Sequence, residues 1–154
     1  MSVRKGCFIL LCVVVVPVVV SGLILSLLVG KEQQSVATAP VTYERLHPDD
    51  KNDVPPFAAN IYKACWTHWQ VGEWAWCFDV PPDSEEVLRE WVRAKGGEPM
   101  DVGENFSCCH MEPPEWWRRP ADARLVSYRL LEHGVSMRMW YSSTVHRVWI
   151  MYAQ

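Results

Sequence analysis

The chain has 154 residues, with 15 lysines and arginines against 18 aspartates and glutamates, and a formal net charge of −3. After position 31 it keeps 12 basic residues and all 18 acidic ones, a formal charge of −6. Because an acidic domain repels phosphate backbones, the composition argues against nucleic-acid binding. The 9 tryptophans indicate either an aromatic core or an adhesive surface.

An uncharged apolar segment occupies residues 6–30. As a helix it would be about 37 Å long at ~1.5 Å per residue, which exceeds the ~30 Å hydrocarbon core of a bilayer. Arg4 and Lys5 precede the segment and Lys31 follows it. This bias favours a cytoplasmic N-terminus, residues 1–5, and places the rest of the chain outside the cytoplasm, in the periplasm or the extracellular space. We therefore expect a single-pass transmembrane signal anchor.

A cleaved signal peptide is the alternative interpretation of the same segment. Residues 19–21, VVS, offer a cleavage site of fairly small side chains. Cleavage there would leave the apolar run LILSLLVG close to the new N-terminus, and the whole apolar run is longer than the 7–15 residues typical of signal peptides. The uncleaved anchor is therefore favoured.

Residues 31–56 are polar and contain four prolines and the acidic run HPDDKND. No helical or strand periodicity persists there, so the segment is predicted to be a flexible linker. The folded domain is predicted to cover residues 57–154.

Two strands are predicted at the start of this domain. The stretch NIYKACWTHWQVGEWAWCFDV, residues 60–80, alternates apolar and polar side chains on both sides of a glycine. A three-residue loop of Gln70, Val71 and Gly72 would close the hairpin, with glycine at a positive φ. This register sets Cys65 opposite Cys77.

A helix is predicted next, from an N-cap at Asp83 to a stop at Gly96, with Glu86 completing a capping box. Three further strands follow an irregular segment, within residues 124–132, 135–141 and 147–153. The order β-β-α-loop-β-β-β predicts an α+β fold, in which one helix packs on one face of a small antiparallel sheet.

Four cysteines follow the apolar segment, and an oxidising compartment makes all of them disulfide candidates. They are Cys65, Cys77, Cys108 and Cys109. The hairpin register would allow a Cys65–Cys77 bond. The alternative, slightly favoured because it would hold the long irregular segment in place, joins each hairpin cysteine to one of the adjacent pair.

A metal or thiol site is the competing hypothesis for Cys108, Cys109 and His110, which would make the protein a zinc- or thiol-dependent enzyme. Three adjacent ligands lack the usual C-x₂-C spacing, and disulfides compete for the thiols outside the cytoplasm. No hydrolase or phosphate-loop motif is present, so no cofactor and no catalytic residue is predicted.

The stretch PPEWWRRP, residues 113–120, is the candidate for partner binding. Neighbouring side chains on extended backbone point in opposite directions, so Trp116 and Trp117 cannot both enter the core. One is expected to pack under the segment, and the other to stack on Arg118 or Arg119 or to contact a partner.

The sequence thus predicts a membrane-anchored extracytoplasmic module that binds a protein. The partner would be a subunit of an envelope complex or a secreted toxin that the domain neutralises, as an immunity-type protein does. A module that binds a sugar or lipid through exposed tryptophans is a further alternative.

Overall fold

The computed structural model describes residues 18–21, 33–68, 71–100, 106, 113–121, 124–132 and 135–153. The chain divides into two compact units, Met1–Glu32 and Gln33–Gln154. Within the first unit, residues 18–21 are helical. Most of the predicted membrane span lies outside the described residues. Among those described, no helix has both the length and the apolar character needed to cross a bilayer.

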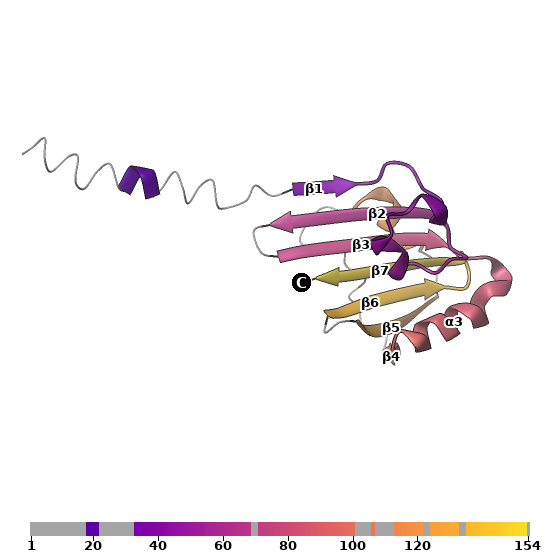
Figure 1. Ribbon diagram of the computed structural model, residues 1–154. Helices are drawn as coiled ribbons and strands as arrows, with labels where there is room; N and C mark the ends of the chain where they lie inside the picture. Colours follow the sequence, from indigo (N-terminus) through magenta and orange to yellow (C-terminus); the bar gives the residue numbers. More distant parts are fainter. Residues whose placement is uncertain are drawn as a thin grey trace, which may run out of the picture. The chain divides into compact units, whose positions relative to one another are not determined.

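The second unit contains a seven-stranded sheet in which neighbouring strands are antiparallel (Figure 1). The strands are β1 (Gln33–Val36), β2 (Ala59–His68), β3 (Val71–Asp79), β4 (Glu98–Met100), β5 (Leu125–Glu132), β6 (Val135–Ser142) and β7 (Arg147–Ala153). Their spatial order is β1-β2-β3-β7-β6-β5-β4. The C-terminal strand β7 therefore lies in the middle of the sheet. The hairpin of β2 and β3 pairs with one of its edges, and β6 pairs with the other. With α3, this sheet confirms the α+β prediction for the domain.

The hairpin of β2 and β3 is confirmed, but its predicted register is wrong. His68 pairs with Val71, so two residues of the sequence, instead of three, separate the paired strand ends. Cys65 consequently lies opposite Trp74. Gly72 is a strand residue, and a Cβ atom there would lie 2.3 Å from the Trp74 ring. The glycine therefore makes room for an indole and does not form the turn.

The helix α3 (Glu85–Ala94) packs its apolar stripe on one face of the sheet, here called the helix face. Leu88 and Val92 are almost completely buried, and each contributes about 1.5–3 kcal/mol on transfer from water. Gly96 ends the helix with φ +67°, as predicted. The start differs from the prediction, because residues 82–84 form a 3₁₀ turn and no side chain caps the helix.

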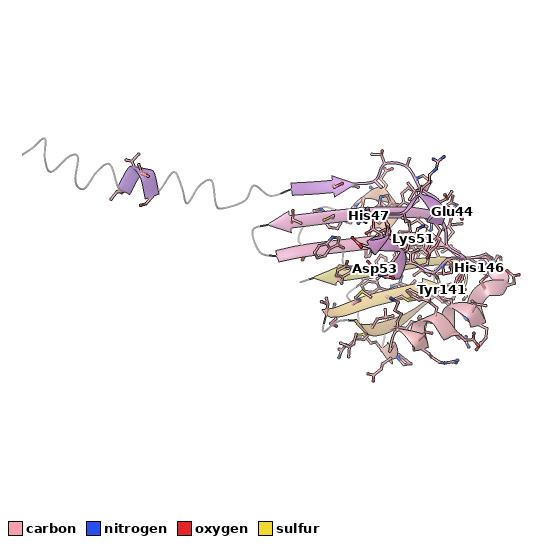
Figure 2. The ribbon with its side chains drawn as sticks, viewed as in Figure 1. Glu44, His47, Lys51, Asp53, Tyr141 and His146 are labelled. Atoms are coloured by element: carbon pink, nitrogen blue, oxygen red, sulfur yellow. The ribbon has the colours of Figure 1, made fainter. Side chains whose placement is uncertain are left out.

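Residues 33–56 differ from the flexible linker that the composition predicts. They contain β1 and two 3₁₀ turns, and they supply Leu46 and Val54 to the core of the helix face. Figure 2 shows His47, Lys51 and Asp53 on the part of this segment that lies over β2 and β3. The compact unit starts at Gln33, so only Lys31 and Glu32 separate it in sequence from the apolar segment.

Polar contacts hold this N-terminal segment on the sheet. The Lys63 ammonium lies 2.6 Å from the Asp50 carboxylate and 4.8 Å from the centre of the Trp76 ring. The Tyr152 hydroxyl donates a hydrogen bond to Asp53 across 3.4 Å. The composition of this segment does not predict these contacts, because the partners of Asp50 and Asp53 lie on β2 and β7.

Candidate partner-binding surface

The face of the sheet opposite α3, here called the tryptophan face, has its own aromatic core. Its buried residues are Ala64, Trp66, Ala75, Cys77, Trp117, Leu125, Trp140 and Trp149. Together with Trp76 on the helix face, 5 of the 9 tryptophans are buried. Trp74, Trp91 and Trp116 are half-buried. Most of the tryptophan content therefore serves the core, which weakens the hypothesis of a ligand site built from exposed tryptophans.

A cover segment, residues 113–120, lies on the tryptophan face. Pro113 and Pro114 lead into a 3₁₀ turn, Glu115–Trp117, because proline fixes φ and suits an extended entry. The Trp117 side chain enters the core, where it is only 2% exposed and stacks on Phe106 at a ring-centroid distance of 5.6 Å. One of the two adjacent tryptophans thus packs under the segment, as the sequence predicts.

Trp116 is held on two sides while part of its ring stays exposed. Its indole N–H donates a hydrogen bond to the carbonyl of Ala37, just after β1, across 3.1 Å. Its own carbonyl accepts a hydrogen bond from the indole N–H of Trp149 on β7, across 3.3 Å. The ring stacks on Tyr62 of β2, with centroids 5.7 Å apart and planes 21° apart. Contacts from three separate parts of the chain therefore fix its orientation.

An ion pair of Asp79 and Arg147 lies on the same face, where β3 ends and β7 begins. Asp79 of β3 and Arg147 of β7 are register partners, and the Arg147 Nε–H donates to the Asp79 carboxylate across 2.6 Å. The second carboxylate oxygen of Asp79 accepts a hydrogen bond from the Asn60 side chain across 2.9 Å. The bond to Asp79 raises the pKa of Arg147, and Tyr62 is close enough to contribute.

The backbone at this end of the sheet adopts two left-handed conformations outside glycine. Asn60, at a register shift in β2, has φ +49°, and His146, in the turn before β7, has φ +50°. The carbonyl of His146 accepts a hydrogen bond from the N–H of Val80, which ties the turn to the end of β3. Asparagine and histidine tolerate this conformation better than most residues. Asn60 and His146 thus lie at the strand ends, close to Asp79 and Arg147.

Together these side chains form what we call the aromatic–arginine surface: Asn60, Tyr62, Asp79, Trp116 and Arg147. It combines stacked aromatic rings with an oriented guanidinium, which are the side chains that most often anchor partners at protein interfaces. Arg118 and Arg119 follow Trp116 in the cover segment and are exposed. Of the residues proposed from the sequence, Trp116, Arg118 and Arg119 are thus accessible, whereas Trp117 belongs to the core.

The hairpin cysteines lie on opposite faces of the sheet, because the observed register shifts β3 by three residues from the predicted one. Cys77 is buried on the tryptophan face, and Cys65 shares the other face with its register partner Trp74. Neither forms a disulfide with a described residue. A Cys65–Cys77 bond is incompatible with this arrangement, since bonded cysteines need Cβ atoms about 3.5–4.5 Å apart. Pairing with Cys108 or Cys109 stays a prediction, because both lie outside the described residues.

The proposed metal ligands Cys108, Cys109 and His110 also lie outside the described residues. Within the described ranges, no group of three histidine, cysteine, aspartate or glutamate side chains could hold a metal ion. Burial raises the pKa of the Cys77 thiol to about 12 and also raises that of Cys65. Neither hairpin cysteine is therefore an activated nucleophile at neutral pH.

Comparison with protein-family models, with curated proteins and with solved structures gave no match.

Proposed function

We propose that the protein is a single-pass, membrane-anchored module that binds a protein partner outside the cytoplasm through the aromatic–arginine surface. The partner is a subunit of an envelope complex or a secreted toxin that the domain neutralises. The observation that carries this proposal is the double anchoring of Trp116, through its indole and its backbone carbonyl, which holds a partly exposed indole against Tyr62.

A fixed aromatic side chain supports tight binding for a physical reason. Ordering a side chain on association costs about 0.5–1.5 kcal/mol. The Trp116 indole is already ordered by its hydrogen bond to Ala37 and its stack on Tyr62, and the bond from Trp149 holds the Trp116 backbone. Tryptophan, tyrosine and arginine are also the residues whose truncation most often weakens an interface. The surface therefore has both the composition and the rigidity that a partner-binding site requires.

The charge of the domain indicates the kind of partner. Residues 32–154 carry 12 basic and 18 acidic side chains, a formal charge of −6. Complementary potentials speed encounter and suppress wrong partners, so an acidic domain favours a partner of net positive charge.

Site-specific photocrosslinking tests this proposal in cells that produce the protein naturally. A photoreactive phenylalanine analogue replaces Arg118, which is exposed beside Trp116, and in a matched control it replaces Glu90, which is exposed on α3. We expect one reproducible protein adduct from position 118 that position 90 does not give. Adduct formation should fall when Tyr62→Ala removes the ring on which Trp116 stacks. The absence of an adduct from position 118, or the same adducts from both positions, would contradict the proposal.

A further inference from the structure

The Arg147 guanidinium is oriented by Asp79, and its side chain is partly exposed. Its Nε–H is bonded to Asp79, and its side chain is 34% exposed. None of the described residues hydrogen-bonds to its two terminal Nη groups. Arginine binds a carboxylate through two parallel N–H donors, and a guanidinium that is already oriented loses less freedom on binding. Arg147 thus presents a pair of Nη donors that no described residue uses.

The aromatic pair of Tyr62 and Trp116 lies on the same face of the sheet as this donor pair. Tyr62 and Cys77 are register partners, Cys77 pairs with Trp149, and Arg147 precedes Trp149 by two residues on β7. Residues two apart on a strand share a face, so Tyr62 and Arg147 both lie on the tryptophan face. They stand on β2 and β7, with β3 between them, and Arg147 lies two residues before the register partner of Cys77 on its strand. Trp116 stacks on Tyr62, and its carbonyl accepts a hydrogen bond from the Trp149 indole N–H, so all of these residues belong to the tryptophan face.

We infer that Arg147 binds a carboxylate of the partner through its Nη groups while a neighbouring apolar or aromatic side chain of the partner packs on Tyr62 and Trp116. This inference rests on the proposed function and names the chemistry that the same surface recognises. The partner would therefore contribute an aspartate or glutamate with a large apolar residue beside it.

The charge of the domain restricts which residues can surround the partner's carboxylate. A domain of formal charge −6 repels a broadly acidic surface at long range, whereas a close bond between arginine and a carboxylate acts over a few ångströms. The recognised carboxylate is therefore an isolated one within a basic or neutral segment. Because the domain carries a formal charge of −6, the partner that fits best is a basic protein segment with one acidic residue next to an apolar one.

A peptide titration of the full chain tests the inference. The protein is held in nanodiscs of neutral phosphatidylcholine, and NMR follows the Arg147 Nε–H and Trp116 Nε1–H signals. The probes are acetyl-Lys-Phe-Asp-Lys-amide and the matched peptide with asparagine in place of aspartate. We expect the aspartate peptide to shift both signals and to bind at least tenfold more tightly than the asparagine peptide. Arg147→Lys should lower its affinity at least tenfold, whereas Arg138→Lys, a change of an exposed arginine on β6, should leave it within twofold.

Equal binding of the two peptides would overturn the inference, and so would a lack of any shift at Arg147. Inorganic phosphate is the third probe, and tighter binding of phosphate than of the aspartate peptide would also overturn it. These results are separate from the crosslinking outcome. An adduct at position 118 combined with equal peptide binding would leave the proposed function standing and remove only the carboxylate. A missing adduct would contradict the proposed function whatever the titration shows.

Discussion

The indole N–H of Trp149 donates to the backbone carbonyl of Trp116, which joins the middle strand of the sheet to the cover segment. Trp116 in turn donates to the carbonyl of Ala37 beyond the first strand. Two tryptophans thereby connect β1, the cover segment and β7, which are far apart in sequence. The partly exposed side chain of Trp116 is consequently held in place by hydrogen bonds at its indole and its backbone.

Replacing Trp116 with phenylalanine should remove the hydrogen bond to Ala37 while keeping an aromatic ring on Tyr62. We expect a loss of about 1 kcal/mol in the free energy of unfolding, measured with denaturant, because the Ala37 carbonyl loses its donor. Trp91→Phe is the matched control, since the Trp91 indole N–H bonds to none of the described residues. Equal losses for the two variants would show that the bond to Ala37 contributes nothing.

The two hairpin cysteines should behave differently toward alkylating reagents. Cys77 is fully buried and Cys65 only partly, so iodoacetamide should modify Cys65 at least tenfold faster in the native protein and both equally fast after denaturation. A peptide map without reduction should contain no Cys65–Cys77 disulfide, because the two side chains lie on opposite faces. Recovery of that bridged peptide would show that the register of β2 and β3 is different in solution.

Alkaline pH should destabilise the domain through Cys77. Burial disfavours the thiolate and raises the pKa of this thiol from its ordinary value of 9.0 to about 12 in the folded chain. Between these pH values the unfolded chain binds fewer protons than the folded one, so the free energy of unfolding falls as pH rises. One thiol contributes a slope of up to about 1.4 kcal/mol per pH unit.

Cys77→Ala isolates this contribution, because alanine does not titrate. Denaturant unfolding measured at intervals from about pH 9 to about pH 11 should show a shallower fall for the variant than for the natural chain. Burial also raises the pKa of Tyr152, which adds to the fall in both proteins and leaves the difference between them unchanged. Parallel curves for the two proteins would contradict the raised pKa of Cys77.

Gly72→Ala should destabilise the hairpin, because the new Cβ atom would lie 2.3 Å from the Trp74 ring. That ring stacks on Tyr152 with centroids 4.9 Å apart, so moving it also disturbs β7. Forced overpacking of this kind costs typically about 1–3 kcal/mol. In a Trp74→Leu background the same glycine change should cost less than about half as much. An unchanged cost in that background would mean that the glycine serves the backbone and not the indole.

Local patterns were sufficient to predict the elements that depend on short-range signals. Alternating side chains predicted β2, β3, β5, β6 and β7, and Gly96 marked the end of α3 through its left-handed conformation. The sequence pattern misplaces the hairpin loop, because it predicts Gly72 in the turn, whereas this glycine gives space to an indole two residues later. A glycine can be needed because a neighbouring side chain occupies the space of its Cβ atom, or because the backbone has a positive φ. The sequence alone does not distinguish these two reasons.

Long-range pairing explains the rest of the differences. The pairing of β3 with β7 brings Asp79 to Arg147, 68 positions away, and nothing local in either strand indicates this. The segment before Phe57 has too little periodicity to predict β1, and its order depends on contacts such as Lys63 with Asp50. The sequence therefore indicated Trp116 as a candidate anchor but not Tyr62, Asp79 or Arg147 beside it.

Hydrogen–deuterium exchange, with and without the partner recovered by crosslinking, is the most direct test of the aromatic–arginine surface. The full chain in nanodiscs should show slower exchange in residues 113–120 and around Arg147 when the partner is bound. Exchange in α3, on the opposite face of the sheet, should stay unchanged. Protection of α3 without protection of residues 113–120 would place the interface elsewhere and contradict the proposed role of Trp116.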